Sequence, residues 1–107
     1  PVRERMKTMS DPVFYSAPLL VFVLGEKNDE WIYADCGICS QNMMLAAYSL
    51  GIASCFIGMA KHIEGEKILG KLNIPEGYKV INAVVFGYAD EKPELKERKK
   101  DNVEWIK

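Results

Sequence analysis

A helical stretch over residues 35–50 constrains the possible folds of this chain more than any other part of the sequence. Asp35 can accept hydrogen bonds from the free N–H groups of a first helical turn. Gly51 follows at the point where helices commonly end in a left-handed residue. Apolar side chains recur at helical spacing and widen to most of the circumference: Ile38, Met44, Leu45, Ala47, Tyr48 and Leu50. A helix that is apolar nearly all round must be covered on nearly all sides, so we expect it at the centre of the fold or at an interface.

The length, net charge, apolar runs and cysteine count of the chain exclude several classes of protein. Its 107 residues suffice for one domain. A net charge of −1 provides no global field for nucleic acid or an anionic membrane. The sequence contains no apolar run of the ~18 residues that a membrane span needs, and we expect no signal peptide. Three cysteines, an odd number, do not suggest a secreted disulfide scaffold, so we expect a cytoplasmic setting.

Three short strands are expected around the helix. Residues 19–24 are apolar and branched without alternation, which indicates a strand buried on both faces. Residues 52–57 and 78–86 are the second and third candidates. Residues 59–72 predict a weaker helix, interrupted by glycines. Together with the central helix, these elements are expected to form the core of a single domain, residues 11–89 of 1–107.

Residues 90–107 form an almost wholly charged arm. Such runs are usually solvated. This one ends in Val103, Trp105 and Ile106, whose apolar side chains need a surface on which to pack. We therefore expect the arm to dock on a neighbouring subunit.

Cys36 and Cys39 form a C-x-x-C motif at the start of the helix, where the helix dipole can stabilise a thiolate. The adjacent Asp35 acts in the opposite direction, because a negative neighbour raises the pKa of a thiol. We favour the alternative that both are small residues at a close packing surface. A metal site would add Cys55 and His62, but a second close ligand pair is missing, so we expect no metal.

Residues 54–58 are a further candidate for a ligand-binding segment, because a short expected strand ends there in Gly58. A glycine at this point lets backbone N–H groups approach a ligand without an intervening side chain. An ordinary strand end fits the same spacing. In the arm, Arg98 and Lys99 could meet a phosphate, although basic residues in a charged run are usually solvated.

The ordered set of these elements resembles the C-terminal half of the nitroreductase family of FMN-dependent oxidoreductases. The resemblance covers residues 11–107. The residues that carry it are Tyr15-Ser-Ala-Pro18, the run from Gln41 to Gly51, Ser54-Cys-Phe-Ile-Gly58, Ile74-Pro-Glu-Gly-Tyr78, Phe86-Gly-Tyr88 and the basic arm.

The resemblance implies an α+β fold with a mixed β-sheet and a central buried helix, in a homodimer with flavins at the subunit interface. It implies that Phe56, Ile57 and Gly58 run beside the flavin ring, and that Arg98, or next Lys99, approaches the flavin phosphate. At that interface Gly37, Ser40 and Ala47 would permit close approach. The implied activity is hydride transfer from NAD(P)H through FMN to nitroaromatic, quinone or similar small-molecule acceptors. Such chemistry belongs to the flavin and requires no catalytic side chain.

One departure from the family pattern is large. The N-terminal arginine and serine cluster that grips the FMN phosphate in the family is not in this sequence. We expect either a piece of a longer protein or a shortened relative, lacking the contacts of that cluster. The alternative function is a flavin-free dimeric structural or interaction module, and a third is a thiol–disulfide protein that uses Cys36 and Cys39.

Overall fold

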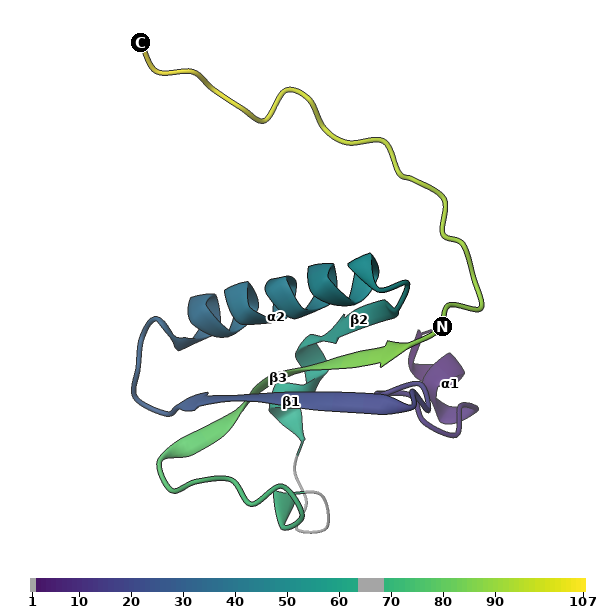
Figure 1. Ribbon diagram of the computed structural model, residues 1–107, viewed down its shortest axis with the longest axis vertical. Helices are drawn as coiled ribbons and strands as arrows, with labels where there is room; N and C mark the ends of the chain where they lie inside the picture. Colours follow the sequence, from purple (N-terminus) through teal and green to yellow (C-terminus); the bar gives the residue numbers. More distant parts are fainter. Residues whose placement is uncertain (1, 64–68) are drawn as a thin grey trace.

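The computed structural model describes residues 2–63 and 69–107. One helix and three strands dominate it, with short helical pieces on either side (Figure 1). In chain order the elements are α1 (Val2–Lys7), β1 (Leu19–Glu26), α2 (Ile32–Ser49), β2 (Ala53–Ile57), the 3₁₀ helix η1 (Gly58–His62) and β3 (Tyr78–Gly87). The helix predicted over residues 59–72 begins as η1, and its residues 64–68 lie outside the described part of the chain.

The sheet has the order β1-β3-β2, so the last strand in the chain is the central one. Leu19 of β1 pairs with Phe86, and Ala53 of β2 pairs with Gly87 of the same strand. The predicted α+β class is confirmed. Both pairings among the described residues are antiparallel, so the parallel component of the expected mixed sheet is not found in this part of the chain.

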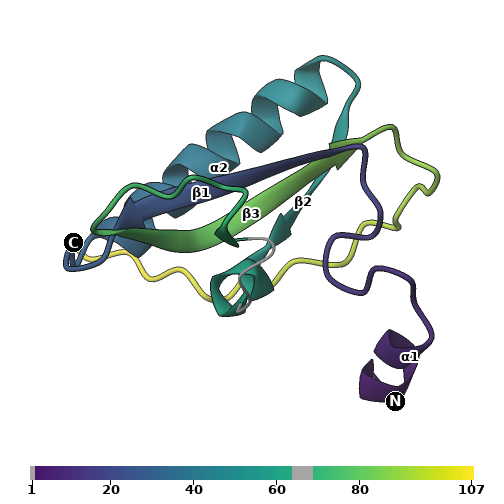
Figure 2. The same cartoon turned by 90° about the horizontal axis from the view of Figure 1, so that it is seen from below.

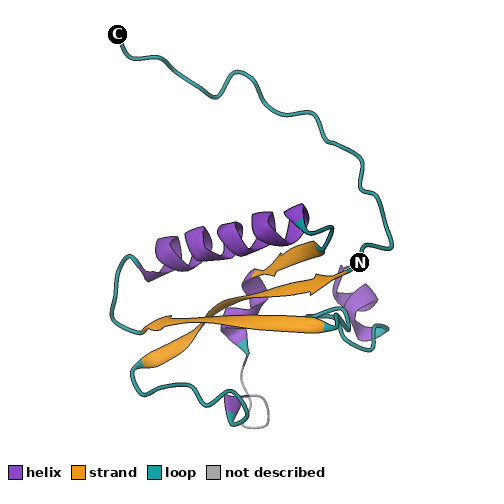
Figure 3. Cartoon of the chain, in the orientation of Figure 1, coloured by secondary structure: helices purple, strands orange, loops and turns teal. Residues whose placement is uncertain are grey.

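Both faces of β3 are covered, which explains the absence of polar alternation in its sequence. On one face Val84 and Phe86 pack against Ala47 of α2. On the other face Ala83 and Val85 pack against the loop before β1, η1 and residues 69–74. Figures 2 and 3 show the resulting layers, with α2 on one side of the sheet and η1 on the other.

Helix α2 begins three residues before its predicted start. Its N-cap is Trp31, whose side chain makes no capping hydrogen bond, and Asp35 lies in the first turn. The prediction that Asp35 caps the helix is therefore wrong, although a carboxylate in the first turn still interacts favourably with the helix dipole. The end at Gly51 is confirmed: this glycine has φ 76° and donates to Tyr48 O, while Ile52 donates to Ala47 O. These paired bonds satisfy the last carbonyl groups of the helix.

Within one chain, α2 is covered on a single face. Its buried residues are Cys36, Ser40 and Ala47, all of them small. Ser40 and Ala47 pack against the sheet of their own chain, so the expectation that they line a subunit interface is wrong. Most of the large apolar side chains of the helix remain exposed.

Asp11 organises the loop that covers the second face of the sheet. Its carboxylate accepts hydrogen bonds from the backbone N–H groups of Val13, Phe14 and Ser16, at 3.3, 2.9 and 3.0 Å. The loop turns through Tyr15 and Ser16, which both adopt left-handed φ angles of 57° and 54°. It thereby brings Phe14 edge-on against Phe22 of β1, with ring centroids 5.7 Å apart. The bonds from Phe14 and Ser16 lower the pKa of Asp11.

We predict that Asp11→Ala lowers the free energy of unfolding at neutral pH by about 1 kcal/mol, as the loss of a comparable cap does. Because the pKa of Asp11 is lower in the folded than in the unfolded state, its contribution is present above the unfolded value, about 3.9. It is lost as the pH falls through the folded value. Denaturant unfolding of both proteins from pH 7 to pH 2 should show the two stabilities converging in acid. A difference that stays constant with pH would contradict this role.

Candidate functional site

The predicted ligand-facing segment lies at the end of an edge strand. Because β2 pairs only with β3 in the described sheet, its outer edge presents backbone N–H and C=O groups that no strand covers. Phe56 is about half exposed, whereas Ile57 is buried in the core with Ala60. A Cβ atom added at Gly58 would meet only the Phe56 ring, at 3.6 Å, so the backbone here is open to approach.

The structure does not bring the predicted phosphate ligands to this segment within one chain. Arg98 and Lys99 are exposed and lie in the arm of residues 90–107, which has no helix or strand. The arm leaves the end of β3 and runs outward past α2 (Figure 1). Trp105 and Ile106 are almost fully exposed at its end. A site that combines the β2 edge with these cations therefore needs the arm in another position or on another chain.

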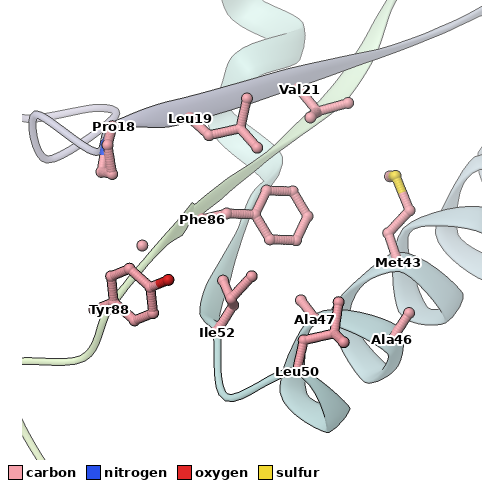
Figure 4. Close-up of a pocket in the computed structure, with 11 residues that line it drawn as sticks. Pro18, Leu19, Val21, Met43, Ala46, Ala47, Leu50, Ile52, Phe86 and Tyr88 are labelled. Carbon is pink, nitrogen blue, oxygen red and sulfur yellow. The ribbon is translucent and has the colours of Figure 1, made fainter.

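A cleft of about 480 Å³ opens between the last turns of α2 and the end of the sheet (Figure 4). Its lining consists of Pro18, Leu19, Val21, Met43, Ala46, Ala47, Leu50, Ile52, Phe86, Gly87 and Tyr88. The only polar side-chain group among these residues is the phenol of Tyr88, so the cleft suits an apolar surface and not a phosphate. The cleft was not predicted from the sequence, although the apolar residues on all sides of α2 indicated such a surface.

The two cysteines of α2 have different environments. Cys36 is buried, with its Sγ 3.9 Å from Leu24 O, while Cys39 is exposed. Burial raises the pKa of Cys36, and the negative charges of Cys39 and Asp35 raise it further. A redox cysteine needs the opposite, a thiolate stabilised at neutral pH. The geometry thus supports the interpretation of Cys36 as a packing residue.

Within residues 2–63 and 69–107, no three histidine, cysteine or acidic side chains are grouped so that they could hold a metal ion. No helix in that part of the chain is long and apolar enough to cross a membrane.

The sequence model of the nitroreductase family matches residues 2–88, and the chain belongs to this family. The predicted family and nitroreductase-like fold are confirmed. The matched range contains Phe56, Ile57 and Gly58 but not the arm with Arg98 and Lys99.

Individual relatives agree with this assignment. A protein of Archaeoglobus fulgidus, provisionally named NADH dehydrogenase/NAD(P)H nitroreductase, is 36% identical over 103 residues, covering 84% of this chain and 59% of that protein. The crystal structure of a nitroreductase with bound FMN from Bacteroides fragilis has a TM-score of 0.80 and 36% identity, covering 98% of this chain and 59% of that one. An FMN-dependent nitroreductase from Mycobacterium smegmatis, in complex with NADPH, has a TM-score of 0.62 and 33% identity, covering 72% and 34%. This chain therefore spans little more than half the length of the first two relatives.

We predict that Cys36 reacts with iodoacetamide about ten times more slowly than Cys55, because burial disfavours its thiolate while Cys55 is exposed. Peptide mapping by mass spectrometry after timed alkylation at pH 8 measures both rates in one sample. Equal rates would contradict the packing role of Cys36.

Proposed function

We propose that this chain contributes one side of the flavin site in an FMN-dependent NAD(P)H oxidoreductase that reduces nitroaromatics, quinones or similar small acceptors. The observation that carries the proposal is the 36% identical match, over 98% of the chain, to a nitroreductase that binds FMN. The relative in complex with NADPH supports a nicotinamide reductant.

The strand end at Phe56, Ile57 and Gly58 has properties that fit a flavin ring. The open backbone at Gly58 leaves room for a flat group, and the half-exposed Phe56 ring offers an apolar neighbour. The free edge of β2 supplies hydrogen-bonding groups for the polar rim of such a ring. On the phosphate side, Arg98 and Lys99 supply positive charge, with arginine able to form two parallel hydrogen bonds to a phosphate.

Bound FMN supplies the hydride chemistry, and the protein supplies position and electrostatics. The β2 edge orients the ring, and Phe56 excludes water from one side of it. Arg98 and Lys99 neutralise the phosphate. In this arrangement no side chain of the chain has to gain or lose a proton at the reacting centre.

A homodimer is part of the proposal. The face of α2 opposite the sheet carries Ile38, Leu45 and Tyr48, which are 64%, 57% and 81% exposed. The apolar cleft beside Leu50 extends the same surface. Exposed apolar patches of this kind mark interaction sites, and a second copy offers a surface of matching character. We assign residues 11–89 to the core of the domain and residues 90–107 to an arm that docks on the second copy, in a cytoplasmic protein.

Titration with FMN tests the flavin proposal. We predict that the chain takes up added FMN, acquires the absorption bands of bound flavin, and loses them when NAD(P)H is added. Gly58→Val should weaken FMN binding about tenfold, because a branched side chain would occupy the open backbone surface. Asn28→Val is the control, since it adds a branched side chain at an exposed position in the turn between β1 and α2.

A chain that remains colourless and binds no added FMN would contradict the flavin proposal. If that protein were still dimeric, the flavin-free interaction module would be the better account of its function.

We also predict that deleting residues 90–107 weakens both dimerisation and FMN binding, because Trp105, Ile106 and the two arm cations are lost together. The double variant Trp105→Ala/Ile106→Ala should weaken dimerisation by about 2 kcal/mol, as for a buried aromatic anchor, and should weaken FMN binding less than the deletion does, because Arg98 and Lys99 remain. Sedimentation velocity measures the first effect and flavin fluorescence the second. Lys92→Ala in the same arm is the control, and a truncated chain with an unshifted dimer would count against docking of the arm.

A further inference from the structure

The apolar pattern of α2 does not by itself decide which of its faces packs on the sheet. At 100° per residue, Ile38 and Leu45 lie opposite Cys36 and Ser40. The fully buried residues on the sheet-facing side are small, with two partly buried methionines beside them, and the outer side carries large exposed apolar ones. Since more buried apolar surface is more favourable, hydrophobic burial alone would turn the large residues inward. Another interaction has to hold the helix in its observed rotation.

A buried hydrogen bond between α2 and the central strand supplies that interaction. The side-chain amide of Asn82 in β3 donates to Ser40 Oγ, with Nδ2 2.8 Å from Oγ. Ser40 Oγ in turn donates to Cys36 O at 2.7 Å. Ser40 is 0% and Asn82 2% exposed. Among the described residues this is the only buried hydrogen bond between side chains of α2 and the sheet, because the bond from Lys79 to Tyr33 is exposed.

The position of Asn82 is specified by an irregularity in the sheet. Val23 of β1 pairs with Asn82, whereas the next residue, Leu24, pairs with Val80. Ile81 is thus an extra residue on β3, and such bulges re-aim neighbouring side chains. Ile81 lies on the α2 side of the sheet, since an added Cβ atom at Gly25 would meet both Ile81 and Ile32. The bulge and the asparagine therefore act at the same contact between helix and sheet.

Rotating α2 would break this contact. Asn82 would remain buried beneath the helix, and its amide would face an apolar side chain in place of the Ser40 hydroxyl. A buried amide without a partner is unfavourable, and that penalty opposes the gain from burying Ile38 or Leu45.

We propose that Asn82 and Ser40 form a rotational lock for α2, which keeps Ile38, Leu45 and Tyr48 turned outward to meet a second copy of the chain. Both are positioning residues, acting through the orientation of the helix. That the outer face of α2 meets a second copy rests on the proposed homodimer. That Asn82 and Ser40 fix the rotation of the helix does not depend on it.

The variant Asn82→Leu tests the lock in the 107-residue chain. It removes the amide at similar side-chain size, and Ser40 keeps its bond to Cys36 O, so no hydroxyl is left unpaired. We expect far-UV circular dichroism like that of the unchanged chain. The alkylation rate of Cys36 should rise about tenfold, and the dimer dissociation constant should rise about tenfold, which corresponds to about 1.4 kcal/mol.

Thr8→Ala is the matched control. It removes a similar bond from a side-chain hydroxyl to a backbone carbonyl, from Thr8 Oγ1 to Arg5 O at 2.9 Å, but Thr8 is exposed and lies outside both α2 and the sheet. Its Cys36 alkylation rate and dimer dissociation constant should equal those of the unchanged chain. If Asn82→Leu does not fold, Asn82→Val, with a smaller branched side chain suited to a strand, is measured in the same way.

The alkylation rate of Cys36 tests the lock, and the dimer dissociation constant tests the homodimer. A folded Asn82 variant in which Cys36 remains as protected as in the unchanged chain overturns the lock. An unchanged chain that is monomeric at all concentrations overturns the homodimer, and the alkylation rate of Cys36 then still decides whether Asn82 fixes the helix. Exposure of Cys36 in the variant together with a weakened dimer supports both.

Discussion

The surface of α2 is the constraint on which the rest of this structure depends. A helix of 18 residues carries apolar side chains all round, yet the sheet of its own chain covers only one side. The fully buried residues of the covered side are small and let the helix lie close to β3, with two partly buried methionines beside them, and the outer side carries Ile38, Leu45 and Tyr48. Exposed apolar surface of this extent indicates a contact with another molecule. The same requirement extends to the cleft beside Leu50 and to the apolar end of the arm.

The proposed flavin site depends on this incomplete covering. One chain contributes an open strand end at Gly58, while its cations Arg98 and Lys99 are exposed in the arm. A second copy that covers α2 would also give the arm a surface to follow. Assembly and cofactor binding are then coupled, because the interactions that order Arg98 are those that bury Trp105.

Much of this could be predicted from the sequence, because strong local signals specify the elements. The glycine at 51 marked the end of α2, and the mostly apolar residues 78–86 indicated the strand β3. The start of α2 was missed because Trp31 makes no side-chain cap and leaves no signal. The rotation of the helix could not be predicted, because apolar residues on every face do not indicate which face packs on the sheet. The available clue was Asn82, a polar residue inside the apolar run of residues 80–86. The proposed place of the arm depends on a second molecule, so it could not be predicted from local sequence signals.

The central claim is that the outer face of α2 contacts a second copy of the chain. Leu45→Glu places a charge in the middle of that face without touching the sheet, so it should leave the fold of each chain intact. Sedimentation equilibrium of the two proteins is the most direct test. The account predicts a dimer for the unchanged chain and a folded monomer for Leu45→Glu. Equal association of the two proteins, or a monomer in both cases, would contradict it.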